Sequence, residues 1–391
     1  MLAATARVAR DLDLAEECVQ DAYVSALTAW GRDGVPESPG AWLTTAARRA
    51  ALNAIARKRT LTAKLPLLLE PEAIDMPEID DDTIPDDRLR LVFLCCHPAL
   101  SPDAQVGLTL RLVCGVETGD IAGALLVSEP TMAARLTRAK RKIAAAGIPF
   151  VVPDPAERPA RLDAVLTVVH LLHTTGHTAP SGEALVRGDL TVRALDLARL
   201  LVALMPAERE ARGLLALLLV NHARRATRTD ADGALVLLED QDRSLWDREA
   251  IAEGDRLVVG ALAGGEPGRF ALQAAIAALH AQARTYEATD WPQIVVLYDA
   301  LLRVWPSPVV ALNRAIAVAM VDGPQAGLAA LDGLADAERL ARYRYLPAAR
   351  ADMLRRLGRT AEAAEAYREA IALTDNEVER AFLARRLAEC G

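Results

Sequence analysis

The sequence is poor in aromatic residues and contains no long apolar run. Phenylalanine, tryptophan and tyrosine together make up 4% of the 391 residues. No stretch of about 18 consecutive apolar residues occurs, which argues against a membrane-spanning helix. The first residues also lack the apolar core and cleavage signature of a secretory signal. We therefore expect a cytoplasmic protein that does not associate with a membrane.

Patterns typical of catalysis and of disulfide or metal chemistry are also missing. No glycine-rich phosphate loop, nucleophile elbow or pair of catalytic carboxylates stands out, so we expect no enzyme activity and no cofactor. The cysteines are odd in number, irregularly spaced and without a CxxC pair, which favours reduced, buried thiols. They are Cys18, Cys95, Cys96, Cys114 and Cys390.

One histidine group is the exception to this lack of site motifs. His170, His173 and His177 are spaced so that two imidazoles can share a helical turn, with the third just beyond. A metal site needs a further ligand, and closely spaced Asp, Glu or Cys are absent from this stretch. Metal binding stays open here, but we favour packed or interfacial histidines and predict no metal site.

Alanine and leucine dominate what is present. Both residues lose little conformational freedom in a helix, and no convincing strand pattern of period two occurs, so the predicted class is all-α. The net charge is −8, so any binding of nucleic acid has to come from local basic patches.

Breaker residues and charge divide the chain into four parts. We predict a helical domain over 1–64, a linker over 65–87, a helical domain over 88–150 and a helical C-terminal domain over 160–391. The linker contains four prolines and, from position 70 on, nine acidic residues without one basic residue. A proline-broken, acidic segment of this kind cannot fold alone, and its composition by itself predicts a solvated spacer.

The first segment of interest spans 11–30. Asp13 and Glu16 are spaced as a capping box. Apolar residues then recur every three or four positions and predict an amphipathic helix. They are Ala15, Val19, Ala22, Ala26 and Trp30. From periodicity alone, the acidic opposite face is a solvated surface.

A second helix is predicted after Ser38 and Pro39, which suit its N-cap and first turn. Trp42, Arg49 and Asn53 share one face because they lie seven and eleven residues apart. Residues 48–64 contain six basic residues and no acid. This combination suits contact with a melted DNA strand, although a solvated basic helix end explains it equally well.

Residues 116–147 have the pattern of a helix-turn-helix. We predict a short helix from Asp120 to Val127, followed by a second helix that Ser128 caps and in whose first turn Pro130 lies. Five basic residues and no acid occur between 131 and 142. Such a second helix enters the major groove of DNA, whereas the competing interpretation is a basic helical hairpin that binds nothing.

Together these segments resemble RNA polymerase sigma factors of the extracytoplasmic-function group, within the sigma-70 family. The resemblance rests on DLDLAEECVQDAYVSALTAW at 11–30, AWLTTAARRAALNAIARKR at 41–59 and the helix-turn-helix at 116–142. It implies a region 2 helical domain, a region 4 helix-turn-helix domain, and as partners promoter DNA and core RNA polymerase, through its β′ clamp helices and its β subunit. The family usually has more residues before 11–30, so we expect either a short first helix or a misplaced start codon. In the family the linker threads toward the polymerase active-site cleft, so the resemblance implies that residues 70–87 either mimic DNA in a basic channel or remain a solvated spacer.

The resemblance also implies roles for individual residues. Polymerase contacts are expected at Asp13, Glu17, Gln20 and Asp21. Contacts with the −10 promoter element are expected at Trp42, Arg48, Arg49, Asn53 and Arg57. Contacts with the −35 element are expected at Ser128, Thr131, Arg135, Arg138, Arg141 and Lys142.

Beyond the sigma regions, the chain is similar to a subgroup that carries a C-terminal tetratricopeptide-like helical-repeat domain. The segments that carry this similarity are LLEDQDRSLWD at 237–247, ALQAAIAALHA at 271–281 and the DW–LYD–L pattern at 290–301. Residues 353–373 resemble half a repeat, with glycine at the turn and Tyr367 packing outward. Such repeats hold a peptide or a protein partner on a concave surface, so a regulatory role is expected.

Three other functions remain as alternatives. A helix-turn-helix regulator that never binds polymerase would explain 116–142 but not 11–59. A tetratricopeptide-type adaptor would use the C-terminal domain alone. A metal-dependent hydrolase would use the three histidines.

Overall fold

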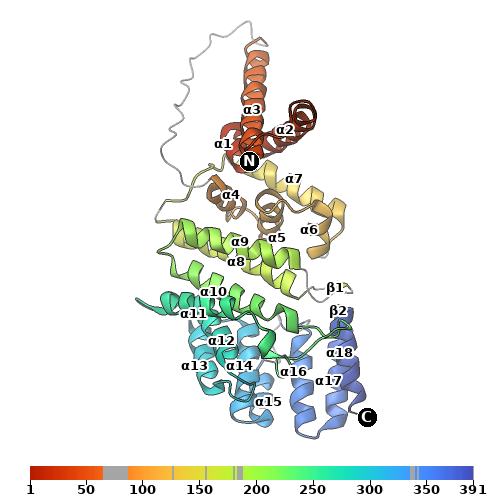
Figure 1. Ribbon diagram of the computed structural model, residues 1–391. Coiled ribbons are helices and arrows are strands. Elements are labelled where there is room, and N and C mark those ends of the chain that lie inside the picture. The colour runs from red at the N-terminus through yellow and green to blue at the C-terminus, as the bar shows by residue number, and fades with distance from the viewer. Residues whose placement is uncertain are drawn as a thin grey trace. The chain divides into compact units, whose positions relative to one another are not determined.

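The computed structural model describes residues 1–64, 87–125, 127–154, 156–178, 181–182, 188–334, 340 and 343–390. The helices in these residues confirm the all-α prediction (Figure 1). The strands within this part are two residues long, β1 (Ser181–Gly182) and β2 (Asp375–Asn376), and pair in parallel. The chain divides into two compact units, Met1–Val168 and Val169–Gly391. The predicted acidic linker falls almost entirely outside the described residues.

The helices of the first unit differ widely in length: α1 has 8 residues, as the short first helix was expected to have, whereas α3 has 26. Its elements are α1 (Leu2–Ala9), α2 (Leu12–Asp33), α3 (Pro39–Lys64), α4 (Asp87–Cys95), α5 (Pro102–Leu108), the π-helix η1 (Thr109–Val113), α6 (Thr118–Ala124), α7 (Glu129–Ala145) and the start of α8 (Arg158–His177).

The N-cap of α2 differs from the predicted capping box. Asp11 caps the helix, because its carboxylate accepts hydrogen bonds from the backbone N–H groups of Asp13 at 2.9 Å and Leu14 at 3.1 Å. The prediction that Asp13 and Glu16 form the capping box was therefore wrong: an aspartate two residues earlier competes for the same role. The side chains of Asp13 and Glu16 are left for other partners.

The helix-turn-helix is present as α6 and α7. The first helix is shifted from the predicted 120–127, since it begins at Thr118 and ends at Ala124. Ser128 caps α7 by accepting a hydrogen bond from the N–H of Thr131. The inward face of α7 is buried as its period predicts: Met132, Leu136, Ala139 and Ile143.

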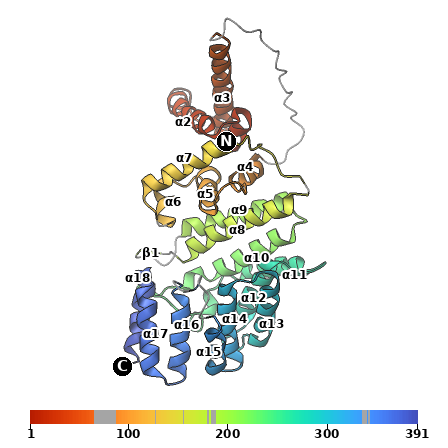
Figure 2. The same cartoon turned by 180° about the vertical axis from the view of Figure 1, so that it is seen from behind.

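The second unit is a succession of helices packed on their sequence neighbours, and Figures 1 and 2 show α16, α17 and α18 side by side. Its elements are the end of α8, α9 (Gly188–Leu204), α10 (Arg209–Ala223), the 3₁₀ helices η2 (Arg225–Thr227) and η3 (Arg243–Leu245), α11 (Arg248–Leu262), α12 (Arg269–Gln282), α13 (Trp291–Val304), α14 (Pro308–Val321), α15 (Pro324–Asp332), α16 (Tyr345–Arg356), α17 (Thr360–Ala372) and α18 (Glu377–Ala388).

The predicted half-repeat at 353–373 corresponds to α16 and α17, joined at Gly358, whose φ of 73° is left-handed. Alanines at the crossing are buried, as expected for closely packed helices. Tyr367 was expected to pack outward, but its side chain is only 2% exposed. It lies on the same face of α17 as Ala363 and Ala370, so the period of the helix places it in the core.

Arginines close several helix ends in this unit. Arg243 donates hydrogen bonds to the carbonyl oxygens of His280 at 2.7 Å and Ala283 at 2.8 Å, at the C-terminus of α12. Arg209 does the same at the end of α11, bonding the carbonyls of Ala261 and Gly265. A cation at a helix C-terminus is favoured by the helix dipole and satisfies carbonyls that lack helical partners.

The segment 237–247, which carried part of the family resemblance, is explained by these contacts. The Arg243 guanidinium also lies 4.6 Å from the ring centroid of Trp246. Trp246 in turn donates its indole N–H to Thr227 at 2.9 Å. Asp242 and Asp247 cap η3 and α11. The segment is therefore a structural connection between helices.

Within the described residues, none of the helices combines the length and apolarity that crossing a membrane requires.

Candidate polymerase and DNA interfaces

The predicted −10 residues lie on α3, and most of them face solvent. Arg49, Asn53 and Arg57 are exposed at spacings of four residues, so they form one stripe. Arg48 and Trp42 are half-buried. Trp42 packs edge-on against Trp30 of α2, with ring centroids 5.6 Å apart. This contact holds Trp42 at the start of the stripe, and the exposed side chains of Arg49 and Arg57 follow it along the helix.

The predicted polymerase contacts lie along one face of α2. Asp13, Glu17, Gln20 and Asp21 are all exposed. The same face continues into apolar residues that the sequence analysis missed: Val24 is 63% exposed and Leu27 is 80% exposed. The signal that would have found them is the seven-residue spacing of 13, 20 and 27. We call this stripe of Asp13, Glu17, Gln20, Asp21, Val24 and Leu27 the α2 face.

The predicted −35 residues are distributed over α7, with Ser128 as its N-cap. Thr131 is exposed, and its hydroxyl lies 2.8 Å from that of Ser128. Arg138 and Arg141 are also exposed. Together these side chains make a basic surface that begins at the helix N-terminus, which is the end that reads bases in a helix-turn-helix.

Two further −35 candidates are already bonded inside the first unit. Arg135 forms an ion pair with Asp103 at 3.0 Å, and Lys142 donates to the backbone carbonyl of Ala99. Both contacts tie α7 to the segment around α5. Arg135 and Lys142 would therefore have to exchange these partners to contact DNA. Arg138 bonds within its own helix, since its Nε–H donates to the carbonyl of Ala134 at 3.3 Å.

Lys140 lies between Arg138 and Arg141 in the sequence but points elsewhere. Its ammonium group lies 2.6 Å from a carboxylate oxygen of Asp13 and 2.6 Å from one of Glu16, both on α2. Glu16 also accepts an ion pair from Arg111 of η1 at 3.4 Å. The structure thus brings an acid of the α2 face against a base of the helix-turn-helix.

The three histidines at 170–177 pack within the second unit. Among the described residues, no group of three metal-ligating side chains comes together. His170 lies edge-on to Phe270 at 5.5 Å, and His173 stacks on His177 at 5.4 Å. Burial, followed by the charge of Arg269, lowers the pKa of His170 to about 4, and burial lowers the pKa of His173 to about 3.

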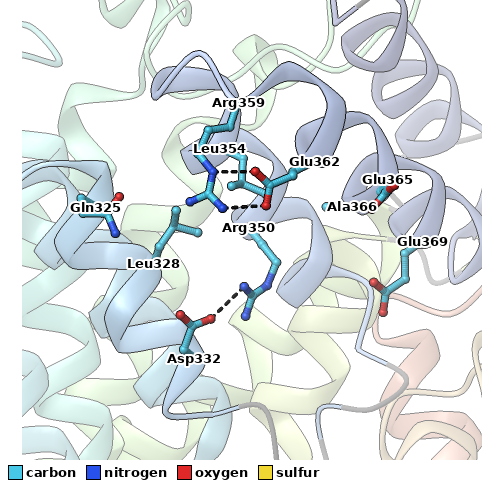
Figure 3. A pocket seen from close by; sticks show the side chains of 10 residues that line it. All are labelled: Gln325, Leu328, Asp332, Arg350, Leu354, Arg359, Glu362, Glu365, Ala366 and Glu369. Carbon is cyan, nitrogen blue, oxygen red and sulfur yellow. Dashed lines mark hydrogen bonds and ion pairs between the residues drawn. The ribbon is translucent and has the colours of Figure 1, made fainter.

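A polar pocket of about 280 Å³ lies among α15, α16 and α17 (Figure 3). Its two arginines are already paired: Arg350 with Asp332 at 2.8 Å, and Arg359 with Glu362 at 2.6 Å. Glu365 and Glu369 also line it, and no ion pair involves them in the described part of the chain. The unpaired charge in this pocket is therefore negative.

Comparison with known proteins agrees with this geometry. Residues 2–60 match the model of Sigma-70 region 2, and residues 90–143 match that of Sigma-70, region 4. Residues 161–262 match a family of unknown function, DUF6596. An uncharacterized protein of Rhizobium meliloti (strain 1021) is 45% identical over 391 residues, covering 99% of this chain and 92% of that protein. No solved structure gives a significant match.

Proposed function

Because the chain belongs to the sigma-70 family of RNA polymerase sigma factors, we propose that it binds core RNA polymerase and directs initiation at promoters with −10 and −35 elements. In this proposal α3 contacts the −10 element and α7 the −35 element. The protein acts as a non-enzymatic initiation factor in the cytoplasm, where polymerase and chromosome meet.

The α2 face is the observation that carries the polymerase-binding part of the proposal. A helix that only covers its own domain has no reason to expose Val24 and Leu27 one turn apart. Acidic residues at one end of the stripe and apolar residues at the other suit a partner helix that is basic and partly apolar. The two basic surfaces on α3 and α7 then provide the DNA contacts.

The experiment that tests this is a binding measurement with core polymerase, followed by run-off transcription. Val24→Ser with Leu27→Ser removes the apolar part of the α2 face without touching the core. We expect affinity for core polymerase to fall at least about tenfold, as for central interface residues. Val259→Ser on α11, also highly exposed at 70%, is the matched control.

Wild-type protein that neither binds core polymerase at low salt nor supports run-off transcription would contradict the whole proposal. The helix-turn-helix regulator without polymerase would then be the better explanation.

For the second unit we propose a regulatory role through a protein or peptide partner at the pocket of Figure 3. The uncompensated carboxylates of Glu365 and Glu369 favour a basic partner segment. Glu365→Gln with Glu369→Gln should change transcript output from the cognate promoter in cells without changing protein level. Glu249→Gln on α11 serves as the control, and equal output from both variants would argue against this pocket.

A further inference from the structure

Three arginines of the second unit lie close together and have no acidic partner. Arg224 is the C-cap of α10, Arg228 follows η2 directly, and Arg243 begins η3. The guanidinium of Arg224 lies 5.9 Å from the ring centroid of Trp246, and that of Arg243 lies 4.6 Å from the same centroid. Within the described part of the chain, none of the three arginines forms an ion pair.

Histidines of α8 continue this group of cations. Arg228 donates hydrogen bonds to the backbone carbonyl of His177 and, at 3.1 Å, to the hydroxyl of Thr178. His177 in turn stacks on His173, with ring centroids 5.4 Å apart. Burial, followed by the charge of Arg228, lowers the pKa of His177 well below its ordinary value. The imidazoles therefore stay neutral at pH 7 and offer N–H groups beside the arginines.

Several nitrogens of this group are buried and have no hydrogen-bond partner among the described residues. They are Nε of Arg224, Nη2 of Arg243, Nε2 of His173 and Nδ1 of His280. The side chain of His173 is only 2% exposed. Buried polar atoms in native proteins are almost always hydrogen-bonded, because an unpaired one costs its full desolvation free energy. Nitrogens that lack an acceptor in one place therefore point to a ligand that supplies oxygens.

The acid whose charge reaches Arg228 is already used elsewhere. Burial lowers the pKa of Arg228 to about 10, and the charges of Tyr345 and Glu379 offset only part of this effect. Glu379 forms an ion pair with Arg344 at 2.8 Å and accepts a hydrogen bond from the hydroxyl of Tyr345 at 2.5 Å. Its carboxylate therefore does not neutralise the three arginines, and positive charge without a partner is costly away from water.

The group reaches the surface, so a ligand can approach it. Arg224, Arg228 and His177 are half-buried, whereas Arg243 and Trp246 are buried behind them. A guanidinium presents parallel N–H groups that fit the oxygens of a carboxylate or a phosphate. Three such cations favour a group that carries more than one negative charge.

We propose that these residues bind a small molecule through a multivalent oxyanion, that is, a phosphate or a polycarboxylate group. We call Arg224, Arg228, Arg243, His173 and His280 the arginine site. None of them lines the pocket of Figure 3, so the arginine site is separate from the proposed partner surface. Binding at this site does not depend on polymerase or on promoter DNA, and it gives the second unit a small-molecule ligand.

Calorimetric titration of the full-length protein with inorganic phosphate and with citrate tests this proposal. Sodium chloride keeps the ionic strength constant, and both anions stay at low-millimolar concentrations, below those at which they stabilise proteins in general. Saturable binding of phosphate alone identifies a phosphate group, and saturable binding of citrate alone identifies a carboxylate ligand. If neither anion binds saturably, the proposal is overturned.

Arg224→Gln shows whether binding occurs at the arginine site. Loss of one charged donor should weaken binding of the anion at least about tenfold. Arg256→Gln on α11 is the matched control, because it makes the same change of charge at an exposed side chain and should leave the affinity unchanged. Equal affinities of Arg224→Gln and wild type, or an equal loss in both variants, would overturn the proposal.

Hydrogen exchange on the wild-type protein decides the question if Arg224→Gln does not fold. A ligand that binds only the folded site slows local opening around it. Saturating anion should therefore slow exchange in residues 222–229 and 241–247 but not in α17. Slowing throughout the chain, or in neither segment, would contradict the arginine site.

Discussion

Exposed arginines of the first unit and bonded arginines of the second unit show two different uses of the same side chain. In Met1–Val168, Arg49, Arg57, Arg138 and Arg141 extend into solvent from α3 and α7. In Val169–Gly391, Arg243 and Arg209 bond carbonyl groups at helix ends. Burial, followed by the charges of Arg228 and Arg243, lowers the pKa of Arg224 in this unit to about 10.

This difference shows that a basic residue in a helical protein indicates DNA binding only when its charge remains uncompensated at the surface. The exposed arginines of the first unit keep their charge available to phosphates. The inward arginines of the second unit satisfy helix carbonyls and contribute to stability. Composition alone does not distinguish the two uses.

Glycine substitutions should give the largest difference between the two units in the change of the free energy of unfolding. A Cβ at Gly213 in α10 would lie 2.6 Å from the backbone nitrogen of Ala271 and 2.8 Å from its Cα. Because the backbone of α12 cannot move away without disturbing its packing, Gly213→Ala should lower the free energy of unfolding of the second unit by about 3 kcal/mol. Hydrogen-exchange mass spectrometry measures this loss in each unit separately.

Gly31→Ala in α2 is the control for that substitution. A Cβ at Gly31 has open space around it, and alanine favours a helix over glycine. We expect the first unit to gain about 0.5–1 kcal/mol. The same sign for both substitutions would contradict the close approach of α10 and α12.

Two arginine substitutions sharpen the comparison further. Arg243→Ala leaves two carbonyls at the end of α12 without their donor and exposes Trp246. The free energy of unfolding of the second unit should therefore fall by about 2–3 kcal/mol.

Arg141→Ala should change the free energy of unfolding by less than about 0.5 kcal/mol, but it should flatten the salt dependence of promoter binding by about one unit of slope. Denaturant unfolding and binding titrations at several salt concentrations measure these effects. If Arg141→Ala unfolded the protein, its assignment to DNA would be wrong.

Acid should weaken the second unit more than the first. The folded-state pKa of His170 is about 4 and that of His173 about 3, both below the ordinary value of 6.5. Between these pKa values the unfolded chain binds protons that the folded chain does not bind. The free energy of unfolding is therefore highest above pH 6.5 and falls as the pH drops toward 4. Between pH 7 and 5 we expect a loss of roughly 1–2 kcal/mol per buried histidine.

Hydrogen exchange at pH 7 and 5, corrected for the intrinsic rate, measures this effect. His97 is the histidine of the first unit and is less buried than His173. An equal loss of protection in both units at pH 5 would show that the histidine cluster does not control acid stability.

Local sequence rules predicted much of the candidate site. The cap at Ser128 and the buried stripe from Met132 to Ile143 follow from residue type and helical period, and both are confirmed. The exposure of Arg49 and Asn53 follows in the same way. The prediction that Asp13 caps α2 was wrong because Asp11 lies two residues earlier and can take the same role. A spacing rule does not decide which of the two aspartates caps the helix.

The contacts of Lys140 and Arg243 were beyond such rules. Lys140 belongs to the run of bases at 135–142, and nothing in that run shows that its partners lie more than 120 residues away in sequence. Arg243 is likewise far from the carbonyls that it caps. Long-range partners depend on how helices pack, which local periodicity does not encode.

The sequence by itself determined that the chain is helical, where its main helices lie, and that two of them carry uncompensated basic residues, because propensity, caps and apolar period are local properties. Only the tertiary structure decided which charges are used inside the fold and which remain for partners. The reason is physical: the availability of a charge depends on its burial and on its opposite charges, and both are set by helices that are distant in sequence.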